Sequence, residues 1–360
     1  MAKVLILQNE ISAYNVSTYN CISELHELTV AYYSKDKSSI PCSFQKHKLN
    51  YIKIKSIILV SDLKSLCKQF DVVIFVPDFH VPAYCLLPFG NRRYKVISWS
   101  IGFRVSYVHP YITYRKHNLL DRFFQKVLSA CDANIFYINK SREFWKNTNL
   151  RMDNIFEAIN TTDVEKIEFK PELKKDFLFI GTLYKGKGLD LLLEAYNKFY
   201  KQSSCNTKLR IVGAGSEREV LEQYVKDNGL QDNVAFHGAI YDEKEILKIF
   251  QQSLLCFSPT QAGLSVPKSM GYGVPFVSRK DAITGGEIYH IQNGVNGIMY
   301  EKDEDLSAIM LDAFENRIKY IDMGRRAMDY YYSKATNEIK AEGVIDAINY
   351  VISLNSATLL

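Results

Sequence analysis

The chain has 360 residues, of which 47% are hydrophobic and 24% are charged, the composition of a soluble globular protein large enough for two domains. This composition excludes a disordered or fibrous protein, and no run approaches the roughly 18 consecutive apolar residues of a membrane span. The amino terminus lacks the features of a signal peptide and the seven cysteines include no close pair, so we expect a cytoplasmic protein without disulfides or a zinc site. The net charge of +5 permits an anionic ligand, and we expect no nucleic-acid partner.

Short apolar strands alternate with helices along the first half of the chain. We predict helices at residues 16–25, 61–69, 119–130 and from 141 onward, and strands at residues 3–7, 28–33, 51–54, 71–77, 94–99, 133–138 and 155–159. This alternation predicts a parallel sheet that is covered by helices on both faces.

A polar, charged stretch at residues 161–175 interrupts the pattern, and a second alternating series follows it. We predict strands at residues 177–181, 208–212, 234–237, 254–258 and 275–278, and helices at residues 189–200, 217–228, 243–252, 266–272, 304–335 and 337–353. The chain is therefore expected to form two tandem Rossmann-like, doubly wound α/β domains that face a cleft. They would comprise residues 1–168 and 174–335, with helix 337–353 packing back on the first domain.

Two strand-to-helix turns of the second domain carry glycines and positive charge. Residues 181–190 begin with Gly181 and place Lys185 and Lys187 ahead of a helix, which favours anion binding. Two solvated loop lysines are the alternative. Residues 210–218 contain Gly213 in a partial GxG pattern, which lacks the third glycine of a dinucleotide fingerprint.

A third segment, residues 258–277, is the most informative. Small residues lie between a strand and a helix that begins near Val266, so the amides of Gly263, Leu264 and Ser265 would point out of the helix N-terminus. A diphosphate binds well at such a position, and Lys268 adds positive charge in the first turn. An ordinary strand-to-helix turn is the alternative.

These segments together resemble the nucleotide-sugar-binding half of retaining glycosyltransferases of the two-Rossmann (GT-B) type, family 4. The resemblance spans about residues 176 to 300 and rests on four groups in order: Gly181, Thr182 and Lys187-Gly188; Gly263-Leu264, Met270, Gly273 and Pro275; Gly285-Gly286-Glu287; and Asn293 to Gly297. It implies the GT-B fold and transfer of a sugar from a nucleotide diphosphate sugar to a hydroxyl of a glycan or lipid-linked saccharide. Such a reaction would belong to bacterial surface polysaccharide synthesis.

The resemblance also implies the roles of single residues. The nucleotide sugar would be bound by Gly181, Thr182, Gly213, His237, Thr260, Gln261, Ala262, Gly263, Leu264, Ser265, Lys268 and Glu287. Catalysis would rest on Lys185 and Lys187, which would stabilise the departing diphosphate, with Arg104 and His80 supplied by the first domain. A surface-loop role for His80 stays open. We expect no metal and no cofactor, because the only Asp-x-Asp pattern, residues 303–305, is typical of an acidic helix start.

The sequence departs from the family pattern at the positions of its two glutamates, which are here Thr260 and Lys268, and at its phosphate-clamp arginine, which falls on Thr182. We expect Lys268 to donate to ribose or diphosphate where a glutamate would accept. Gln261 would bind the donor sugar in place of the glutamate that Thr260 replaces, and Arg104 would supply the missing guanidinium. The departures leave two alternatives open: a non-catalytic nucleotide-sugar-binding relative and a GT-B nucleotide-sugar epimerase.

Residues 114–128 combine an apolar helical face with basic side chains outside it. A basic amphipathic helix of this kind predicts peripheral contact with the inner membrane face. A core helix with a solvated face is the alternative. The basic residues are Arg115, Lys116, Arg122 and Lys126.

Overall fold

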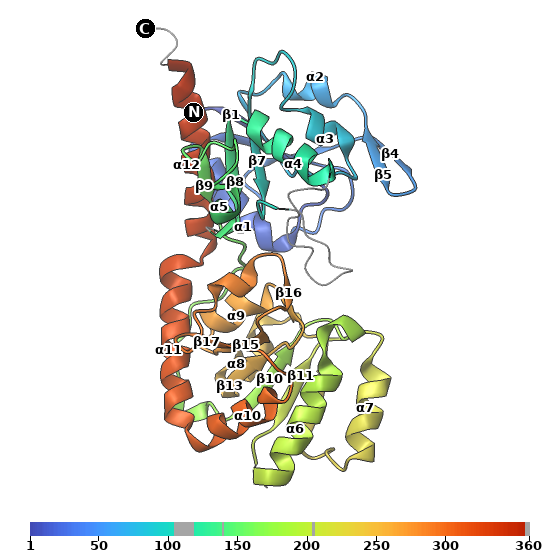
Figure 1. The fold of residues 1–360 in the computed structure, drawn as a ribbon, viewed down its shortest axis with the longest axis vertical. Helices are drawn as coiled ribbons and strands as arrows, with labels where there is room; N and C mark the ends of the chain where they lie inside the picture. The colour runs from blue at the N-terminus through green and yellow to red at the C-terminus, as the bar shows by residue number, and fades with distance from the viewer. Residues whose placement is uncertain (104–118, 139, 204–205, 357–360) are drawn as a thin grey trace. The chain divides into compact units, whose positions relative to one another are not determined.

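The computed structural model describes residues 1–103, 119–138, 140–203 and 206–356, which form two compact units (Figure 1). Unit 1 contains the described residues of 1–160 together with 337–356, and unit 2 contains those of 161–336. The predicted class, two Rossmann-like α/β domains with parallel sheets, is confirmed. Within the described ranges, no helix is both long enough and apolar enough to cross a membrane.

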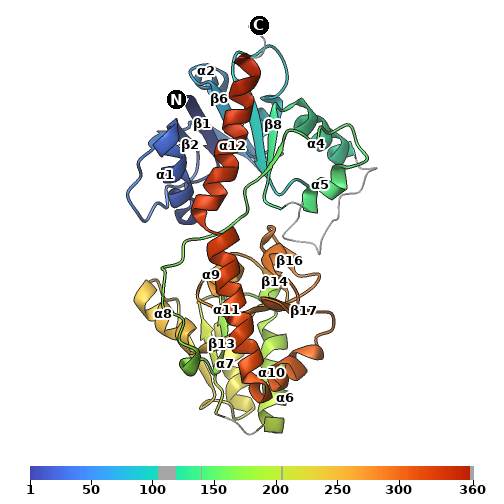
Figure 2. The same ribbon diagram turned by 90° about the vertical axis from the view of Figure 1, so that its left-hand side faces the viewer.

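Unit 1 is built on a seven-stranded parallel sheet in the order β3-β2-β1-β6-β7-β8-β9. Side chains alternate along the inner strand β1: Val4 and Ile6 pack with α1 and α12, whereas Leu5 and Leu7 pack with α2, α3 and α4. Figure 2 shows α12 lying across this sheet. The strands of the sheet are β1 (Lys3–Gln8), β2 (Glu27–Tyr32), β3 (Gln45–Lys48), β6 (Val72–Phe75), β7 (Lys95–Ser100), β8 (Ala133–Phe136) and β9 (Ile155–Glu157).

The other described elements of unit 1 are its helices and a hairpin of two antiparallel strands. The helices are α1 (Val16–Leu25), α2 (Leu63–Cys67), α3 (Pro82–Leu86), α4 (Leu119–Ala130), α5 (Lys140–Trp145) and α12 (Asn337–Ser356), and the hairpin strands are β4 (Tyr51–Ile54) and β5 (Ile57–Val60).

Unit 2 has a six-stranded parallel sheet in the order β12-β11-β10-β13-β15-β17 and a separate pair of two-residue strands, β14 and β16. Phe177 and Phe179 on the central strand β10 pack on apolar side chains of α6. The strands are β10 (Asp176–Ile180), β11 (Leu209–Val212), β12 (Val234–Gly238), β13 (Ser253–Phe257), β14 (Gln261–Ala262), β15 (Phe276–Arg279), β16 (Ile283–Thr284) and β17 (Gly297–Tyr300). The helices are α6 (Leu189–Ser203), α7 (Arg218–Asp227), α8 (Glu243–Gln252), α9 (Ser265–Gly271), α10 (Asp305–Glu315) and α11 (Arg317–Lys334).

The boundary between the units lies earlier than the predicted end of the first domain at residue 168. The segment after residue 160 packs on α11 of unit 2: Tyr331 Oη donates to the Thr162 carbonyl (2.8 Å), and the Arg325 guanidinium lies 5.0 Å from the Phe169 ring centroid. The sequence did not predict that this polar stretch packs on unit 2. One of the contacts is made by the backbone carbonyl of Thr162, and the pattern of side chains gives no information about backbone contacts.

Two predicted elements differ from the structure. The helix predicted at 304–335 is two helices, because Asn316 leaves helical geometry (φ −112°, ψ 42°) between α10 and α11. The strand predicted at 51–54 forms, but it pairs with β5 in the hairpin and takes no place in the main sheet. That place belongs to β3, whose sequence QKHK is entirely exposed and carries no apolar signal.

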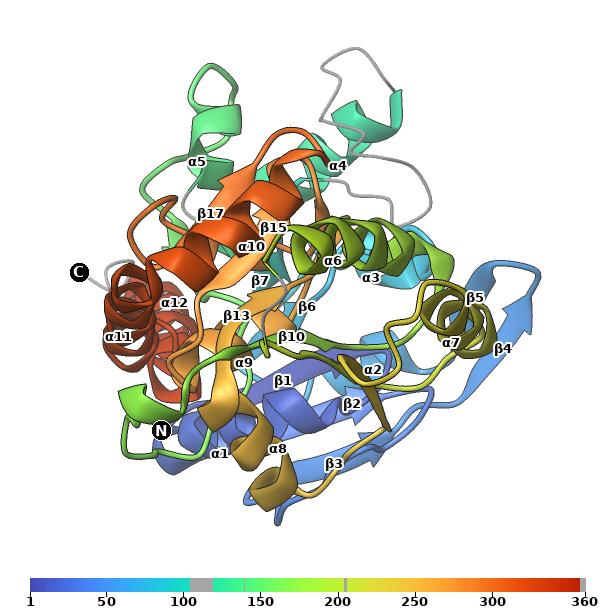
Figure 3. The same cartoon turned by 90° about the horizontal axis from the view of Figure 1, so that it is seen from below.

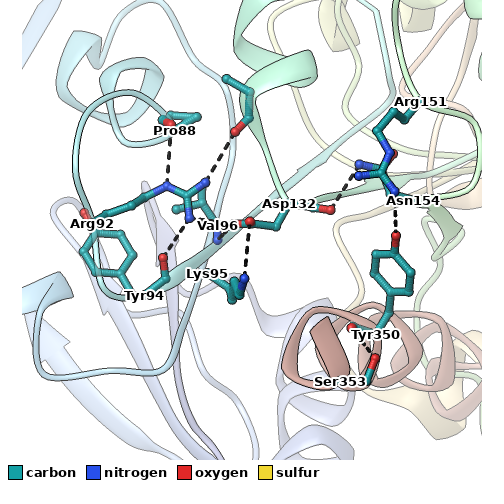
Figure 4. A network of polar contacts seen from close by, with 11 residues as sticks. Pro88, Arg92, Tyr94, Lys95, Val96, Asp132, Arg151, Asn154, Tyr350 and Ser353 are labelled. Carbon is teal, nitrogen blue, oxygen red and sulfur yellow. Dashed lines mark hydrogen bonds and ion pairs between the residues drawn. The ribbon is translucent and has the colours of Figure 1, made fainter. Parts of the chain in front are cut away.

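A polar network stabilises the amino-terminal edge of the unit 1 sheet (Figure 4). Asp132 Oδ2 accepts hydrogen bonds from Arg92 Nη1 and from the Val96 amide, both at 2.7 Å. Nearby, Arg151 Nη2 donates to Tyr350 Oη (3.1 Å) and so attaches α12 to the unit. These charged side chains therefore serve the fold, at the edge opposite to the one where parallel sheets bind ligands.

A buried lysine fixes the segment before β10 to unit 2. Lys174 Nζ lies 3.3–3.4 Å from the carbonyl oxygens of Phe250, Ser253 and Tyr272, at the carboxyl ends of α8 and α9. It also lies 5.2 Å from the centroid of the Phe169 ring. Only 2% of Lys174 is exposed, and this burial lowers the pKa of its ammonium to about 7.

We expect Lys174→Met to change how stability depends on pH. Above about pH 7 the folded wild type releases a proton that the unfolded chain keeps up to about pH 10, so the wild type gains stability as the pH rises. The free energy of unfolding of K174M relative to wild type should therefore fall by on the order of 3 kcal/mol between about pH 7 and pH 9.5. Urea unfolding at both pH values measures this, with the exposed neighbour Lys175→Met as control. An unchanged difference would show that the Lys174 amine titrates normally.

Candidate functional site

Four loops of unit 2 meet beyond the carboxyl ends of its strands. The Gly181 amide donates to Val212 O (3.0 Å), which joins the loops after β10 and β11, and the Gly213 amide donates to Gly238 O (2.7 Å) at the end of β12. The Ile283 amide donates to Thr260 O (2.9 Å), which joins the loops after β13 and β15. The structure thus brings together the four segments that the sequence singled out, at the edge where doubly wound sheets bind ligands.

Glycine is required where the first two loops approach each other. Gly213 has a φ of +145°, and a Cβ there would lie 1.8 Å from Gly181 O. Gly188, at the end of the lysine turn, has a φ of +67° and packs against Pro259 and Thr260. These glycines let the backbone loops lie in contact, which leaves no room for a side chain between them.

Lys187 is a partly buried cation in this site. It ends the short turn Lys185–Lys187, and it is half-buried, whereas Lys185 is exposed. Burial lowers the pKa of the Lys187 ammonium, and the nearby Glu287 carboxylate acts in the opposite direction. Glu287 is itself buried, and its Oε2 accepts from Thr284 Oγ1 (3.0 Å) and from the Gly285 amide (2.8 Å). The structure therefore places Glu287 beside Lys187 and uses it to order the 284–286 turn.

Thr260 and Gln261 hold the lysine turn in place. Thr260 Oγ1 donates to Gly186 O (2.7 Å), and Gln261 Oε1 accepts from Tyr184 Oη. The carboxamide oxygen of Gln261 is thus already in use within the protein, a contact that the sequence did not predict. Both side chains position Lys187 from the neighbouring loop, because Gly186 and Tyr184 belong to the same turn.

The loop after β13 presents backbone amides. Ala262 is fixed by pairing of β14 with β16, and α9 begins three residues later at Ser265. Within the described chain, the amides of Gly263, Leu264 and Ser265 donate to no protein acceptor, and all three residues are partly exposed. Such amides are available to an anion.

Lys268 lies on α9 but is paired within the protein. Its Nζ donates to Glu243 Oε1 (2.8 Å), and Glu243 Oε2 accepts from Tyr272 Oη (2.9 Å). Glu243 is the first residue of α8, and its side chain is 51% exposed. A carboxylate supplied by another helix therefore accompanies Lys268, and the expectation that Lys268 donates to ribose or diphosphate stays a prediction.

This pair sharpens a prediction for position 268. Lys268→Glu would place a second carboxylate against Glu243 and add negative charge to an anion site. Lys268→Ala would only remove one of the two donors to Glu243, and Tyr272 would still donate to it. We expect K268E to bind nucleoside diphosphates about tenfold more weakly than K268A, a difference of about 1.4 kcal/mol. Isothermal titration calorimetry of both variants measures this. Tighter binding by K268E would show that the site expects a carboxylate at 268.

Three other predicted residues have weaker structural support. Thr182 is exposed in the loop after β10, and His237 lies on the edge strand β12, where partial desolvation and the Arg210 charge lower its pKa. Arg104 falls outside the described residues.

His80 belongs to unit 1, where it lies in the loop after β6. Its Nδ1 is 2.9 Å from Asp78 Oδ1, and its side chain is 65% exposed. Tyr33 and Tyr51 lie nearby with ring centroids 5.4 Å apart, and burial together with the Asp78 charge raises the pKa of Tyr33. This polar and aromatic group lies at the carboxyl edge of the unit 1 sheet. The sequence pointed to His80 alone, because the tyrosines come from distant strands.

The acidic residues of the Asp-x-Asp pattern are engaged in local contacts. Arg279 lies 3.4 Å from Asp303, and Asp305 Oδ2 accepts from the Lys302 amide (3.1 Å) at the start of α10. Over the residues that the structure describes, no three His, Cys, Asp or Glu side chains form a group suited to a metal ion.

Comparison with known proteins gives a consistent assignment. Residues 160–330 match the family model described as "Glycosyl transferases group 1". An uncharacterized glycosyltransferase of Methanocaldococcus jannaschii is 29% identical over 163 residues, which are 43% of this chain and 40% of that protein. The chain spans less than two thirds of the length of the curated relatives it matches, 65% in a Haemophilus influenzae glycosyltransferase and 54% in a Bacillus anthracis synthase.

Solved structures extend the likeness to nearly the whole chain. Anabaena HepE in complex with UDP-glucose has a TM-score of 0.66 at 12% identity, covering 97% of this chain and 100% of that one. WaaG, a glycosyltransferase involved in lipopolysaccharide biosynthesis, has a TM-score of 0.63 at 13% identity, covering 94% and 98%. At these identities the likeness concerns the fold. Residues 160–330 are thus similar to the glycosyl transferases group 1 family, within a chain whose two Rossmann-like units have the GT-B fold.

Proposed function

We propose that this protein is a retaining glycosyltransferase of family 4 type, which moves a sugar from a nucleotide diphosphate sugar to a hydroxyl of a glycan or lipid-linked saccharide. The observation that carries the proposal is the half-buried Lys187, whose turn is held by Thr260 of the loop that also carries the available amides. A cation that is desolvated and fixed in advance stabilises developing negative charge far better than one in water.

The reaction would depend mainly on binding the departing diphosphate. Lys187, Lys185 and the amides of residues 263–265 would stabilise the negative charge that develops on the diphosphate as the bond from the anomeric carbon to the phosphate oxygen breaks. An acceptor hydroxyl would attack the oxocarbenium-like sugar on the face from which the diphosphate leaves and would pass its proton to the departing diphosphate oxygen, so the anomeric configuration would be retained. The proposed site uses amines and amides, so we expect turnover to persist in EDTA.

Glu243 would supply a carboxylate for the nucleotide. One oxygen accepts from Lys268 and the other from Tyr272, and a carboxylate can accept about four hydrogen bonds in total. The remaining capacity suits vicinal hydroxyls such as those of ribose. In this proposal Lys268 orients Glu243, and α8 provides the acidic group that the resemblance expects on α9.

The acceptor would bind to unit 1, at the edge that carries Tyr33, Tyr51, Asp78 and His80. Aromatic rings and charged hydrogen-bonding groups together suit a saccharide.

We propose a cytoplasmic protein that acts at the inner membrane face in bacterial surface polysaccharide synthesis. The basic amphipathic segment predicted to contact the membrane spans residues 114–128. Its described part is helix α4, because residues 114–118 fall outside the described ranges.

One observation favours a second candidate, a nucleotide-sugar-binding protein without activity. Thr260 and Lys268 occupy the positions of the two family glutamates, and both are engaged in contacts within the protein. Such contacts would also be expected in a site that has lost its chemistry but kept its fold.

The test is incubation with UDP-glucose, UDP-N-acetylglucosamine, GDP-mannose and ADP-glucose, each with octyl glycosides and a bacterial lipid extract as acceptors, with and without EDTA. Release of nucleoside diphosphate together with an α-linked product from an α-linked donor, unaffected by EDTA, is the expected result. Binding of a donor without acceptor-dependent release would favour the inactive candidate. Conversion of the donor sugar in the absence of acceptor would instead indicate an epimerase, and a β-linked product would overturn retention.

A further inference from the structure

The positive charge of the chain is concentrated in one segment of unit 1. Residues 45–68 contain six lysines and one aspartate and, with His47 taken as neutral, no other charged residue; their net charge of +5 equals that of the whole chain. The rest of the protein is therefore neutral overall. Of the six lysines, Lys46 pairs with Asp36 (2.7 Å), whereas Lys53 and Lys55 are exposed and form no ion pair within the described residues.

The same segment exposes large apolar side chains. It contains the β4–β5 hairpin, which extends away from the sheet of unit 1 in two views (Figures 1 and 3). Every residue of β4 is exposed, with exposed fractions of 66% for Ile52 and 55% for Ile54, and Leu59 on β5 is 46% exposed. Lys53 lies between the two isoleucines and Lys55 follows them, so apolar and cationic groups alternate at the tip.

Contacts join the hairpin to other exposed apolar groups of unit 1. The Ile58 amide of β5 donates to His80 O (2.7 Å), and the preceding residue Phe79 lies 5.7 Å, between ring centroids, from Phe123 on α4. Phe123 is 37% exposed, and the first turn of α4 adds Leu119 at 78%. The hairpin and α4 are thus linked through one loop, at the carboxyl edge of the sheet.

Exposing isoleucine side chains to water costs free energy, and this cost is removed when a lipid bilayer or a protein partner covers them. Lysines beside these isoleucines repel a cationic partner and attract an anionic surface, and a two-stranded tip with alternating Ile and Lys suits the boundary between lipid headgroups and acyl chains. We propose that the β4–β5 hairpin, with α4 beside it, docks unit 1 on an anionic phospholipid bilayer, Ile52 and Ile54 entering the interface while Lys53 and Lys55 contact lipid headgroups.

This docking does not depend on the glycosyltransferase proposal. It rests on the charge and exposure of residues 45–68, and it would hold for a binding protein of the same fold. If both proposals hold, the bilayer would lie beside the edge of unit 1 that carries Tyr51 and His80. An acceptor attached to a lipid would then reach that edge without leaving the membrane.

The experiment uses the full chain and large unilamellar vesicles of phosphatidylcholine, either pure or with about 30% phosphatidylglycerol. Vesicle sedimentation compares wild type with Lys53→Gln/Lys55→Gln and with the matched control Lys198→Gln/Lys201→Gln, two exposed lysines of α6 in unit 2. Removing the hairpin pair should weaken binding to anionic vesicles roughly 30-fold, whereas the control should bind like wild type.

A second measurement reports the insertion itself. The two natural tryptophans, Trp99 and Trp145, are buried, so a tryptophan introduced at an exposed position gives a separable signal. I52W fluorescence should shift to the blue with anionic vesicles and be quenched by brominated acyl chains, whereas I318W on α11 should not respond. Thermal unfolding of each variant shows that its fold is retained.

Several results would overturn the proposal. These are equal binding by K53Q/K55Q and wild type, equal binding to neutral and anionic vesicles, or an I52W spectrum that vesicles do not change. Concentration-dependent dimerisation of wild type that Ile52→Asn/Ile54→Asn abolishes, without any vesicle binding, would assign the hairpin to a second copy of the chain.

Discussion

Replacing Lys187 with alanine is expected to lower kcat/KM at least about 100-fold, or about 2.7 kcal/mol of transition-state stabilisation. Lys187 is half-buried at the end of a turn that Thr260 fixes, so its ammonium needs little reorganisation when charge develops on the diphosphate. Loss of this group would remove an interaction that strengthens as the bond breaks, so kcat should fall more than KM rises.

The matched control is Lys201→Ala, which removes an exposed lysine from the end of α6 in the same unit. K201A should keep wild-type turnover, which would show that the loss in K187A does not come from the change in net charge. Steady-state release of nucleoside diphosphate measures both variants. Activity of K187A within about twofold of wild type would remove Lys187 from the reaction.

The second large effect is expected for Gly213→Ala. A Cβ at this residue would lie 1.8 Å from Gly181 O, and the φ of +145° is strained for alanine. The backbone at Gly181 or Gly213 would have to move, because the atom that the Cβ meets is the Gly181 backbone oxygen and not the end of a flexible side chain. We expect a loss of about 3 kcal/mol or more of stability, a decrease in Tm of roughly 6–12 °C, and loss of nucleotide binding, because Gly181 begins the loop that carries Lys187.

Gly229→Ala provides the comparison for backbone strain alone. Gly229 has a φ of +65°, but a Cβ there would meet nothing within 4 Å. G229A should therefore cost only about 1–2 kcal/mol and leave nucleotide binding intact. Differential scanning fluorimetry with and without nucleoside diphosphate tests both variants, and similar decreases in Tm would contradict the proposed role of loop contact at Gly213.

The fold and the loops of the candidate site could be predicted because they follow local rules. The alternation of strands and helices determines the parallel sheets, and the carboxyl ends of parallel strands bring Gly181, Gly213 and the 258–265 loop to one edge. No long-range information is needed for that step.

The pairings between side chains could not be predicted, because they join positions far apart in the chain. Glu243 and Lys268 come from different helices, and the hydrogen bond from Thr260 to Gly186 crosses between two loops. A sequence shows which residue type stands at each position, but it does not show which distant residue pairs with that side chain in the folded protein. The same reason explains the missed strand β3, whose exposed side chains give no apolar alternation and whose position depends on pairing with β2.

The central claim, that the loops around Lys187 bind a nucleoside diphosphate, is tested most directly by thermal unfolding of wild type, K187A and K201A with UDP, GDP and ADP at about 1 mM. We predict that one of these nucleotides stabilises wild type and K201A equally, by about 2.7 kcal/mol if its Kd is near 10 μM, and stabilises K187A much less. If none of the three changes the Tm of wild type, or if K187A is stabilised as strongly as wild type, the account of this site is wrong.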